Sequence, residues 1–288
     1  MILLSGCGKS PEPGQPVSGT PPQNTNQQIF QVKGIVVEVT PEKKSITIKH
    51  ETVPNYMPAM TMPFDVRDTN ELTGLEAGDS VSFRMIVTDT DGWIDRIVKT
   101  GTAANTLPEG LHRVRDVEPL NEGDLLPEYQ FTNQFGKVFN TADFKGKALA
   151  ITFLFTRCPF PTFCPFLSNS FGDTQKKLLA MTNAPTNWHL LAISFDPEFD
   201  TPDVLKNYGE IHHCDPAYWT LATGELIDIT ALGEQLGLAF WHDESGSISH
   251  NLRTAVIDSS GHIQKLFIGN EWTSDDLVAE IVKAAAKK

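Results

Sequence analysis

The chain has 288 residues and a formal net charge of −13, from 36 acidic and 23 basic residues. Hydrophobic residues make up 40% of it, and this length and composition are enough to bury the cores of two globular domains. The acidic balance argues against a nucleic-acid binder, because that class depends on clustered lysine and arginine. No apolar run in the sequence reaches the length of a transmembrane helix.

The first 29 residues predict an anchor and a spacer rather than a folded element. Leu4-Ser5-Gly6-Cys7 resembles a bacterial lipobox, in which the cysteine becomes the lipidated first residue of the mature protein. We therefore expect residues 1–7 to be the remnant of a lipoprotein signal, with Cys7 lipidated. Residues 8–29 are rich in Pro, Gly, Gln and Asn, which predicts a flexible linker. Together they suggest a domain held at the periplasmic, oxidising side of a bacterial membrane.

Residues 30–101 predict a small all-β domain. The apolar and polar residues alternate in several short segments, which turn signals separate. These segments are residues 34–40, 45–50, 80–87 and 93–98. Five short strands without a helix indicate a small barrel of the OB type.

After a predicted linker at residues 102–122, residues 123–288 alternate between strand and helix patterns. We expect strands at 148–155, 189–195, 252–257 and 263–268, and helices at 166–182, 201–210, 228–236 and 274–286. This order indicates an α/β domain similar to a thioredoxin fold with insertions.

The segment most informative about chemistry places two cysteines just past a buried strand. The apolar run at 148–155 leads directly to Cys158 and Cys164, and a helix is expected to begin soon after Cys164. A helix N-terminus stabilises a thiolate and lowers the pKa of the thiol. Such a pair can form a disulfide, exchange one, or bind a soft metal. His250 precedes a later strand, where its loop would face the cysteines.

A second group of soft donors lies in the all-β domain. Three of the six methionines fall between Met57 and Met62. Alternate residues of a strand share a face, so Met60 and Met62 would project together. Thioether sulfur suits Cu(I) or Ag(I), although a core strand that happens to contain methionine has the same pattern.

Three segments of the second domain, taken in order, resemble the Sco/SenC family of copper-binding, thioredoxin-like proteins. They are Cys158-Pro with Cys164-Pro165, Ser194-Phe-Asp196-Pro-Glu-Phe-Asp200-Thr-Pro202, and His250 with Val256-Ile-Asp258. In that family two cysteines and a distal histidine bind copper during assembly of the dinuclear copper centre of cytochrome c oxidase. The resemblance, over residues 120–286, implies that Cys158, Cys164 and His250 bind Cu(I) and also Cu(II). The common family form has three residues between its cysteines, whereas this chain has five.

The methionine segment resembles a second family, the CusF-like periplasmic domains that bind copper or silver in a small OB barrel. The residues that carry the resemblance are His50 and Met57-Pro-Ala-Met60-Thr-Met62. They imply that His50, Met60 and Met62 are ligands. The family's tryptophan, which covers the metal, falls at Met57, where another thioether would stand.

Two further polar segments predict structural roles. His212-His213-Cys214-Asp215 could chelate a metal, but it lies away from the implied ligands, and we interpret it as incidental with Cys214 a free thiol. Asp196, Glu198 and Asp200 are expected to cap and hold the following helix rather than to act in acid–base catalysis.

These observations lead to three hypotheses. The first is a lipid-anchored copper chaperone that delivers copper to the copper-site subunit of cytochrome c oxidase or to another periplasmic copper protein. The second is a thiol–disulfide oxidoreductase, in which Cys158 and Cys164 form the redox-active pair and act on the cysteines of a copper site. The third is sequestration of copper or silver. Because thiolates should bind copper more tightly than thioethers, the linker at 102–122 would let copper pass from the first domain to the second.

Overall fold

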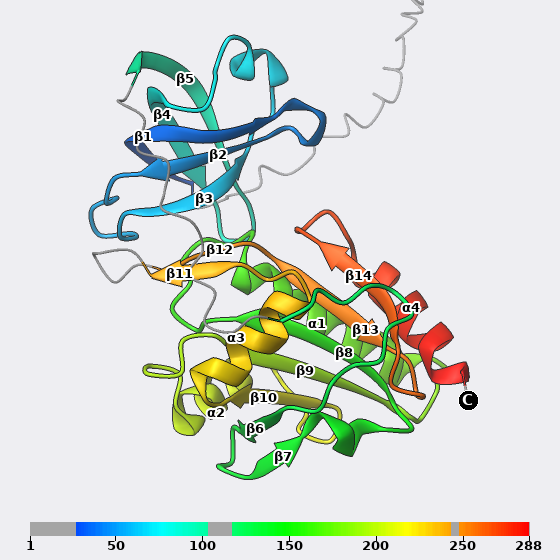
Figure 1. Ribbon diagram of the computed structural model, residues 1–288. Coiled ribbons are helices and arrows are strands. Elements are labelled where there is room, and N and C mark those ends of the chain that lie inside the picture. Colours follow the sequence, from blue (N-terminus) through cyan, green and yellow to red (C-terminus); the bar gives the residue numbers. More distant parts are fainter. Residues whose placement is uncertain (1–26, 103–116, 243–247, 288) are drawn as a thin grey trace, which may run out of the picture.

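The computed structural model describes residues 27–102, 117–242 and 248–287. The expected lipidation residue Cys7 and most of both predicted linkers lie outside these ranges. The described chain forms a five-stranded sheet from its first part and a seven-stranded sheet with helices from its second part, one above the other in Figure 1. We refer to residues 27–102 as the N-terminal domain and to residues 117–287 as the C-terminal domain.

The N-terminal domain is an antiparallel sheet whose strand order is β3-β2-β1-β4-β5. The strands are β1 (Gln28–Thr40), β2 (Ser45–His50), β3 (Met60–Asp65), β4 (Asp79–Val87) and β5 (Gly92–Thr102). The sheet curls, because a bridge between Val66 and Ile94 brings the chain after β3 to β5. Buried apolar residues from the alternating pattern, among them Phe64 and Phe83, fill its interior.

The N-terminal domain also contains two short 3-10 helices where the sequence predicted no helix. They are η1 (Pro41–Lys43) and η2 (Thr69–Leu72). A carboxylate oxygen of Asp68 accepts a hydrogen bond from the Asn70 backbone N–H and so caps η2. Single turns of this kind have too few residues to give a helical period in the sequence, which is why the pattern did not predict them.

The sheet of the C-terminal domain has the order β14-β13-β8-β9-β10-β6-β7. Its strands are β6 (Gln130–Asn133), β7 (Val138–Asn140), β8 (Ala148–Leu154), β9 (Trp188–Ser194), β10 (Trp219–Thr223), β13 (Arg253–Ile257) and β14 (Ile263–Ile268). Strands β8, β9 and β10 are parallel, and every residue of β8 and β9 is buried. Burial on both faces explains the continuous apolar runs of these central strands.

Helices cover both faces of this sheet. They are α1 (Cys164–Ala180), α2 (Pro202–Ile211), α3 (Leu226–Gln235) and α4 (Ser274–Ala286), with the short η3 (Thr141–Phe144) after β7. Figure 1 shows α3 in front of the sheet, with α1 and α4 together behind it. The predicted helices lie within two residues of the observed ones. The shift of α1 matters for function, because this helix begins at Cys164 itself.

A separate hairpin of the C-terminal domain packs against the N-terminal domain. It consists of β11 (Phe240–His242) and β12 (Ile248–His250), and it lies under β3 of the N-terminal domain in Figure 1. The backbone N–H of Thr61 on β3 donates a 2.8 Å hydrogen bond to Oγ of Ser249 on β12. The end of β12 therefore lies directly against the methionine strand.

A buried histidine in the sheet leads to a prediction about pH. His189 on β9 lies 4.8 Å from the Phe144 ring, and burial lowers its pKa to about 4. In the unfolded chain this group has a pKa near 6.5. Above pH 6.5 the histidine is neutral in both states and the free energy of unfolding is at its full value. As the pH falls toward 4, the unfolded chain takes up a proton that the folded chain does not, so the free energy of unfolding falls. The difference corresponds to about 3 kcal/mol of unfolding free energy.

Chemical unfolding of the wild type at pH 7 and at pH 4.5 should therefore show a steep loss of stability. The loss should be smaller in His189→Gln, which has no charge to gain. The half-exposed His262 provides the matched variant, His262→Gln, which should behave like the wild type. An equal loss of stability in His189→Gln and in the wild type would contradict the assignment.

Candidate metal centre

The structure brings Cys158, Cys164 and His250 together. One potential ligand atom from each, two thiol sulfurs and an imidazole nitrogen, lies within 4.8 Å of the others. The Cys164 sulfur lies 3.9 Å from Nε2 of His250. Cys164 and His250 are buried and Cys158 is partly exposed. Two sulfurs and one imidazole form a donor set that suits a soft metal ion.

Three elements that are distant in sequence position this cluster. Strand β8 ends at Leu154, and the chain then turns through Cys158 to the first residue of α1, Cys164. His250 is the last residue of β12. Three aromatic rings surround its imidazole at centroid distances of 5.0 to 5.5 Å, from Phe155, Phe163 and Phe195. These rings restrict the imidazole to an orientation that faces the sulfurs.

The hydrogen bonding of His250 leaves one ring nitrogen available for a metal. Nδ1 lies 2.9 Å from the carbonyl oxygen of Asn251. A carbonyl only accepts hydrogen bonds, so Nδ1 carries the proton in the neutral ring. The lone pair is then on Nε2, which points toward Cys164. A backbone carbonyl that orients a histidine in this way is a common feature of metal sites.

The two thiols differ strongly in acidity. Burial raises the pKa of Cys158, but interactions with Cys164 and His250 outweigh it and lower this pKa well below its ordinary value. Burial and the adjacent Cys158 raise the pKa of Cys164 well above its ordinary value. Cys158 is therefore the group that is ready as a thiolate, and Cys164 keeps its proton until a metal ion or an oxidant displaces it.

Asp200 holds the loop that carries Cys158, a role that the sequence did not predict. Its buried carboxylate accepts hydrogen bonds from the backbone N–H and the hydroxyl of Thr156, and from the Ser194 hydroxyl at 2.5 Å. The expectation that it caps α2 is wrong, because the hydroxyl of Thr201 occupies that position. The reason is geometric: the turn after β9 points Asp200 back toward the end of β8, where Thr156 offers two donors.

Asp196 also acts on this loop rather than on the helix. Its carboxylate pairs with Arg157 at 2.5 Å, and the Arg157 guanidinium lies over the Phe199 ring. Arg157 directly precedes Cys158 in the sequence. The carboxylates of the segment therefore fix the residues on the N-terminal side of the first cysteine.

The methionine strand forms a second group of soft donors. Met60 and Met62 both lie on β3 and are buried, as their alternation on one strand suggested. His50 on β2 is directly opposite Met60 in the strand register. Its Nδ1 lies 2.7 Å from the Glu51 carbonyl, and its buried Nε2 has no hydrogen-bond partner. Burial lowers the pKa of His50, which favours the neutral ring.

An unpartnered, buried Nε2 on the residue that pairs with Met60 fits a soft metal ion. A buried polar atom without a partner is costly unless a ligand satisfies it. His50 and His250 also share one arrangement, in which Nδ1 donates to the carbonyl of the next residue and Nε2 is free to bind. Met57 is buried in the turn after β2, where it bridges to Val53.

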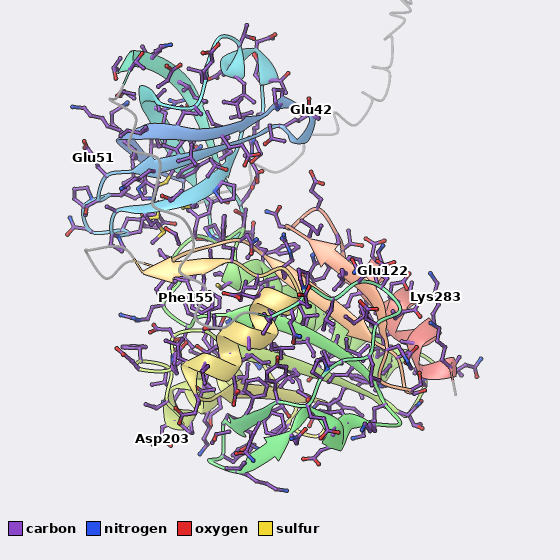
Figure 2. The ribbon with its side chains drawn as sticks, in the orientation of Figure 1. Glu42, Glu51, Glu122, Phe155, Asp203 and Lys283 are labelled. Carbon is purple, nitrogen blue, oxygen red and sulfur yellow. The ribbon has the colours of Figure 1, made fainter. Side chains whose placement is uncertain are left out.

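The two groups of donors meet at the boundary between the domains. Met60, Met62, Cys158 and His250 line one cavity of about 10 Å³, which we call the interdomain cavity. Phe155, labelled in Figure 2, lines it from the part of the C-terminal domain nearest the N-terminal sheet. His50 and Met57 do not line it, within the part of the chain that the structure describes. No pattern in the sequence predicted this proximity.

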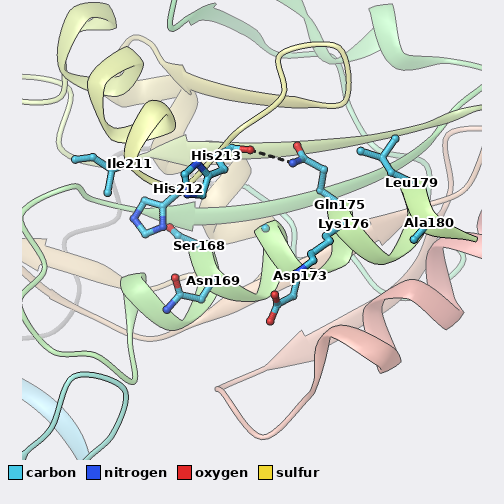
Figure 3. A pocket seen from close by; sticks show the side chains of 11 residues that line it. Ser168, Asn169, Asp173, Gln175, Lys176, Leu179, Ala180, Ile211, His212 and His213 are labelled. Atoms are coloured by element: carbon cyan, nitrogen blue, oxygen red, sulfur yellow. Dashed lines mark hydrogen bonds between the residues drawn. The ribbon is translucent and has the colours of Figure 1, made fainter. Parts of the chain in front are cut away.

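The segment His212-His213-Cys214-Asp215 does not form a metal-ligand cluster among the described residues. The Cys214 thiol donates to the Trp219 carbonyl at 3.0 Å, and burial raises its pKa to about 12. His213 takes part through its backbone carbonyl, which accepts a hydrogen bond from Gln175 (Figure 3). This segment borders an open groove of about 640 Å³ beside α1, which neither Cys158 nor Cys164 lines.

Comparison with known families identifies the second half of the chain. The family model described as SCO1/SenC matches residues 117–286, more than half of the protein. The chain belongs to the SCO1/SenC family. A second family model, described as Copper binding periplasmic protein CusF, matches residues 29–99. The two matches confirm copper as the cofactor of this Sco protein.

Individual relatives agree with the family. A SCO2-like protein of Rickettsia felis is 28% identical over 151 residues, which are 49% of this chain and 67% of the relative. The crystal structure of a SCO1/SenC family lipoprotein from Bacillus anthracis is similar with 31% identity and a TM-score of 0.51, covering 58% of this chain and 98% of that one. BsSco is similar with 26% identity and a TM-score of 0.50, over 60% and 99% of the two chains. The predicted fold class, a thioredoxin-like domain preceded by an OB-type β domain, is confirmed.

The described residues contain no helix that combines the length and the hydrophobicity needed to cross a membrane.

Proposed function

We propose that this Sco protein is a periplasmic copper chaperone that delivers copper during assembly of the dinuclear copper site of cytochrome c oxidase. One observation carries the proposal: two separate sets of soft donors, one thiolate and one thioether, each include a histidine whose Nδ1 is held by a backbone carbonyl, which leaves the lone pair on Nε2. A chaperone must hold copper firmly and still release it, which open sets of two or three ligands allow. Its partner is the copper-site subunit of the oxidase or another periplasmic copper protein.

In this proposal Cys158, Cys164 and His250 hold the copper that is delivered. The two sulfurs favour Cu(I), and the imidazole lets the same site hold Cu(II). The similarity to BsSco supports the role in delivery, since BsSco is described as a member of the Sco family of cytochrome c oxidase assembly proteins.

The N-terminal domain would capture Cu(I) with His50, Met60 and Met62. Neutral thioethers and a neutral imidazole bind Cu(I) without the loss of a proton, so capture continues as the periplasm becomes acidic. Met57 is buried in the turn after β2, where its backbone pairs with that of Val53. We assign it to the core of the turn rather than to the ligand set.

We further propose that Cys7 anchors the protein to the outer face of the membrane through a lipid. The similarity to a SCO1/SenC family lipoprotein supports this assignment. With residues 8–29 as a spacer, the copper sites could reach a membrane-bound oxidase subunit.

A second function, thiol–disulfide exchange, is favoured by the acidity of the cysteines. A thiol with a low pKa beside one with a high pKa is the arrangement in which the first attacks a disulfide and the second resolves the mixed disulfide. The published description of BsSco also refers to a disulfide switch. Both functions use the same two sulfurs, but only copper binding requires His250.

Replacing His250 separates the two functions. In His250→Ala, the Cu(I) affinity of the cysteine site should fall at least about tenfold, about 1.4 kcal/mol, because one of its three ligands is missing. A competition titration with a Cu(I) chelator measures this loss, and a disulfide-reduction assay runs in parallel. His262→Ala, which changes a half-exposed histidine of the same domain, is the matched control. Unchanged copper affinity together with strong reductase activity would favour the oxidoreductase.

A further inference from the structure

The five residues between Cys158 and Cys164 dock the C-terminal domain onto the N-terminal domain. Phe160, the second of these five residues, is only 2% exposed. Its ring packs edge-on against Phe64 of β3 at a centroid distance of 5.8 Å. The neighbouring Pro159 carbonyl accepts a 3.0 Å hydrogen bond from the Tyr56 hydroxyl. The loop that carries the cysteines is therefore also in direct contact with the methionine domain.

Gly92 provides the space for this contact. A Cβ atom added to Gly92 would lie 2.6 Å from the tip of the Phe160 ring, much closer than carbon atoms pack. The Phe160 ring is also held by Phe163 at 5.8 Å. Only glycine at the start of β5 lets the ring lie where it does.

A second contact lies between the two sets of donors. The Thr61 N–H donates to Oγ of Ser249, and both residues are buried. Thr61 stands between Met60 and Met62 in the sequence, and Ser249 directly precedes His250. This hydrogen bond therefore fixes the methionines against the histidine, at the interdomain cavity that Cys158 also lines.

The size and walls of the interdomain cavity suit a single ion. Its volume of about 10 Å³ is close to the space that one water molecule or one metal ion needs. Apart from the donors, its lining is largely apolar and includes Phe155, Phe160, Phe163 and Ile248. Such walls offer few other ligands, so the sulfur and nitrogen atoms are the main donors for an ion inside.

We propose that the two copper sites are the two sides of one closed relay, and that the enlarged cysteine loop is the element that closes it. Cu(I) passes from the methionines to the cysteines through the interdomain cavity without entering bulk water. This inference rests on the proposed function, since it requires copper at both sites. It assigns a role to the two extra residues of the loop, which distinguish this chain from the common family form.

The transfer is a ligand exchange without a change of oxidation state. The copper–sulfur bonds to Met60 and Met62 and the copper–nitrogen bond to His50 break, and these neutral donors become free. Bonds form to the sulfurs of Cys158 and Cys164 and to Nε2 of His250. The thiol proton of Cys164 leaves as its copper–sulfur bond forms and reaches solvent on the side of the partly exposed Cys158. Anionic thiolates bind Cu(I) more tightly than neutral thioethers, so the exchange runs toward the C-terminal domain.

A competition between two copies of the chain tests the relay. All chains carry Cys7→Ser and Cys214→Ser, so only Cys158 and Cys164 remain. The donor copy is oxidised with diamide to a Cys158–Cys164 disulfide and loaded with one equivalent of Cu(I). A phosphine reductant is then added together with an acceptor copy, His50→Ala with Met60→Leu and Met62→Leu, at about 1 mM. Native mass spectrometry distinguishes the two copies by mass and shows which one holds the copper.

The acceptor concentration separates docking from simple tethering. A flexible linker gives the cysteines of the same chain an effective concentration on the order of 1 mM, so tethering alone would divide the copper about equally between the copies. The closed relay predicts that the donor copy holds at least about ten times as much copper as the acceptor copy. An equal division by the docked wild type would overturn the relay.

Variants of the docking contact give the second comparison. Gly92→Val should open the docking contact by a clash with the Phe160 ring, and Phe160→Ala should open it by removing that ring. In both variants the copper should divide about equally between the donor and acceptor copies. Gly101→Val is the matched control. Gly101 lies on the same strand as Gly92, and a Cβ atom added there would meet no atom within 4 Å. Retention at the wild-type level by both docking variants would also overturn the relay. A wild-type donor that takes up no Cu(I) before reduction would instead overturn the capture of copper by the N-terminal domain in the proposed function, and the relay with it.

Discussion

Replacing Cys158 and Cys164 together by serine should abolish the copper site of the C-terminal domain while the protein still binds one Cu(I) through its methionines. A hydroxyl is a hard, neutral donor and cannot replace a thiolate toward a soft ion. We expect the affinity of this site to fall by about four orders of magnitude or more, about 6 kcal/mol. A Cu(I) competition titration should show the stoichiometry change from two ions per chain to one.

The fourth cysteine of the chain provides a sharp control for this result. Cys214 donates its thiol proton to the Trp219 carbonyl and lies outside the ligand cluster. Cys214→Ser keeps a donor at that position and should bind two Cu(I) ions, as the wild type does. Full copper binding by the double cysteine variant would remove Cys158 and Cys164 from the site.

Replacing Met60 and Met62 together by leucine should remove the copper site of the N-terminal domain and leave its fold intact. Leucine and methionine have similar volumes, so each exchange of a buried side chain costs less than about 1.5 kcal/mol in stability. The two soft sulfurs are lost, and His50 alone cannot hold Cu(I). We expect the affinity of this site to fall by about two orders of magnitude or more, about 3 kcal/mol.

Met85 offers a matched control, since it is a buried methionine on β4 of the same domain and does not line the interdomain cavity. Met85→Leu should keep both copper sites and should have the same small effect on thermal stability as the test variant. If the double variant bound Cu(I) as tightly as Met85→Leu, the methionines would be ordinary core residues, the alternative that the sequence left open.

Taken together, the two experiments separate the domains functionally. Each removes one set of donors and leaves the other, so a chain with two independent sites should lose copper in two separate steps. Loss of both sites from either change would mean that the ligands of the two domains form a single shared site in the interdomain cavity.

The sequence could predict both sets of donors because each rests on local pattern or on a family resemblance. The alternation of Met60 and Met62 predicts one face of a strand. The resemblance to CusF-like domains supplied His50, and the structure places it opposite Met60. The apolar run of β8 predicts a buried central strand, and reactive groups collect at the ends of such strands. Family resemblance supplied His250, which is 86 residues from Cys164 and has no local signal of its own.

The role of Asp200 was missed for a physical reason. A carboxylate just before a helix usually caps it, and the local sequence offers no other partner. The actual partners, the backbone N–H and the hydroxyl of Thr156, are 44 residues away and come close only because β8 and β9 pair in parallel. Local rules cannot include a donor that pairing of strands brings into reach.

By itself, therefore, the sequence determined the two kinds of fold and predicted a set of soft donors for each domain, because these follow from periodicity, residue chemistry and family motifs. The tertiary structure alone decided that the two sites face each other. That arrangement depends on the fit of Phe160 over Gly92 and on the hydrogen bond from Thr61 to Ser249, which joins residues 188 positions apart. Shape complementarity between distant segments leaves no periodic trace in a sequence, so only the folded chain reveals it.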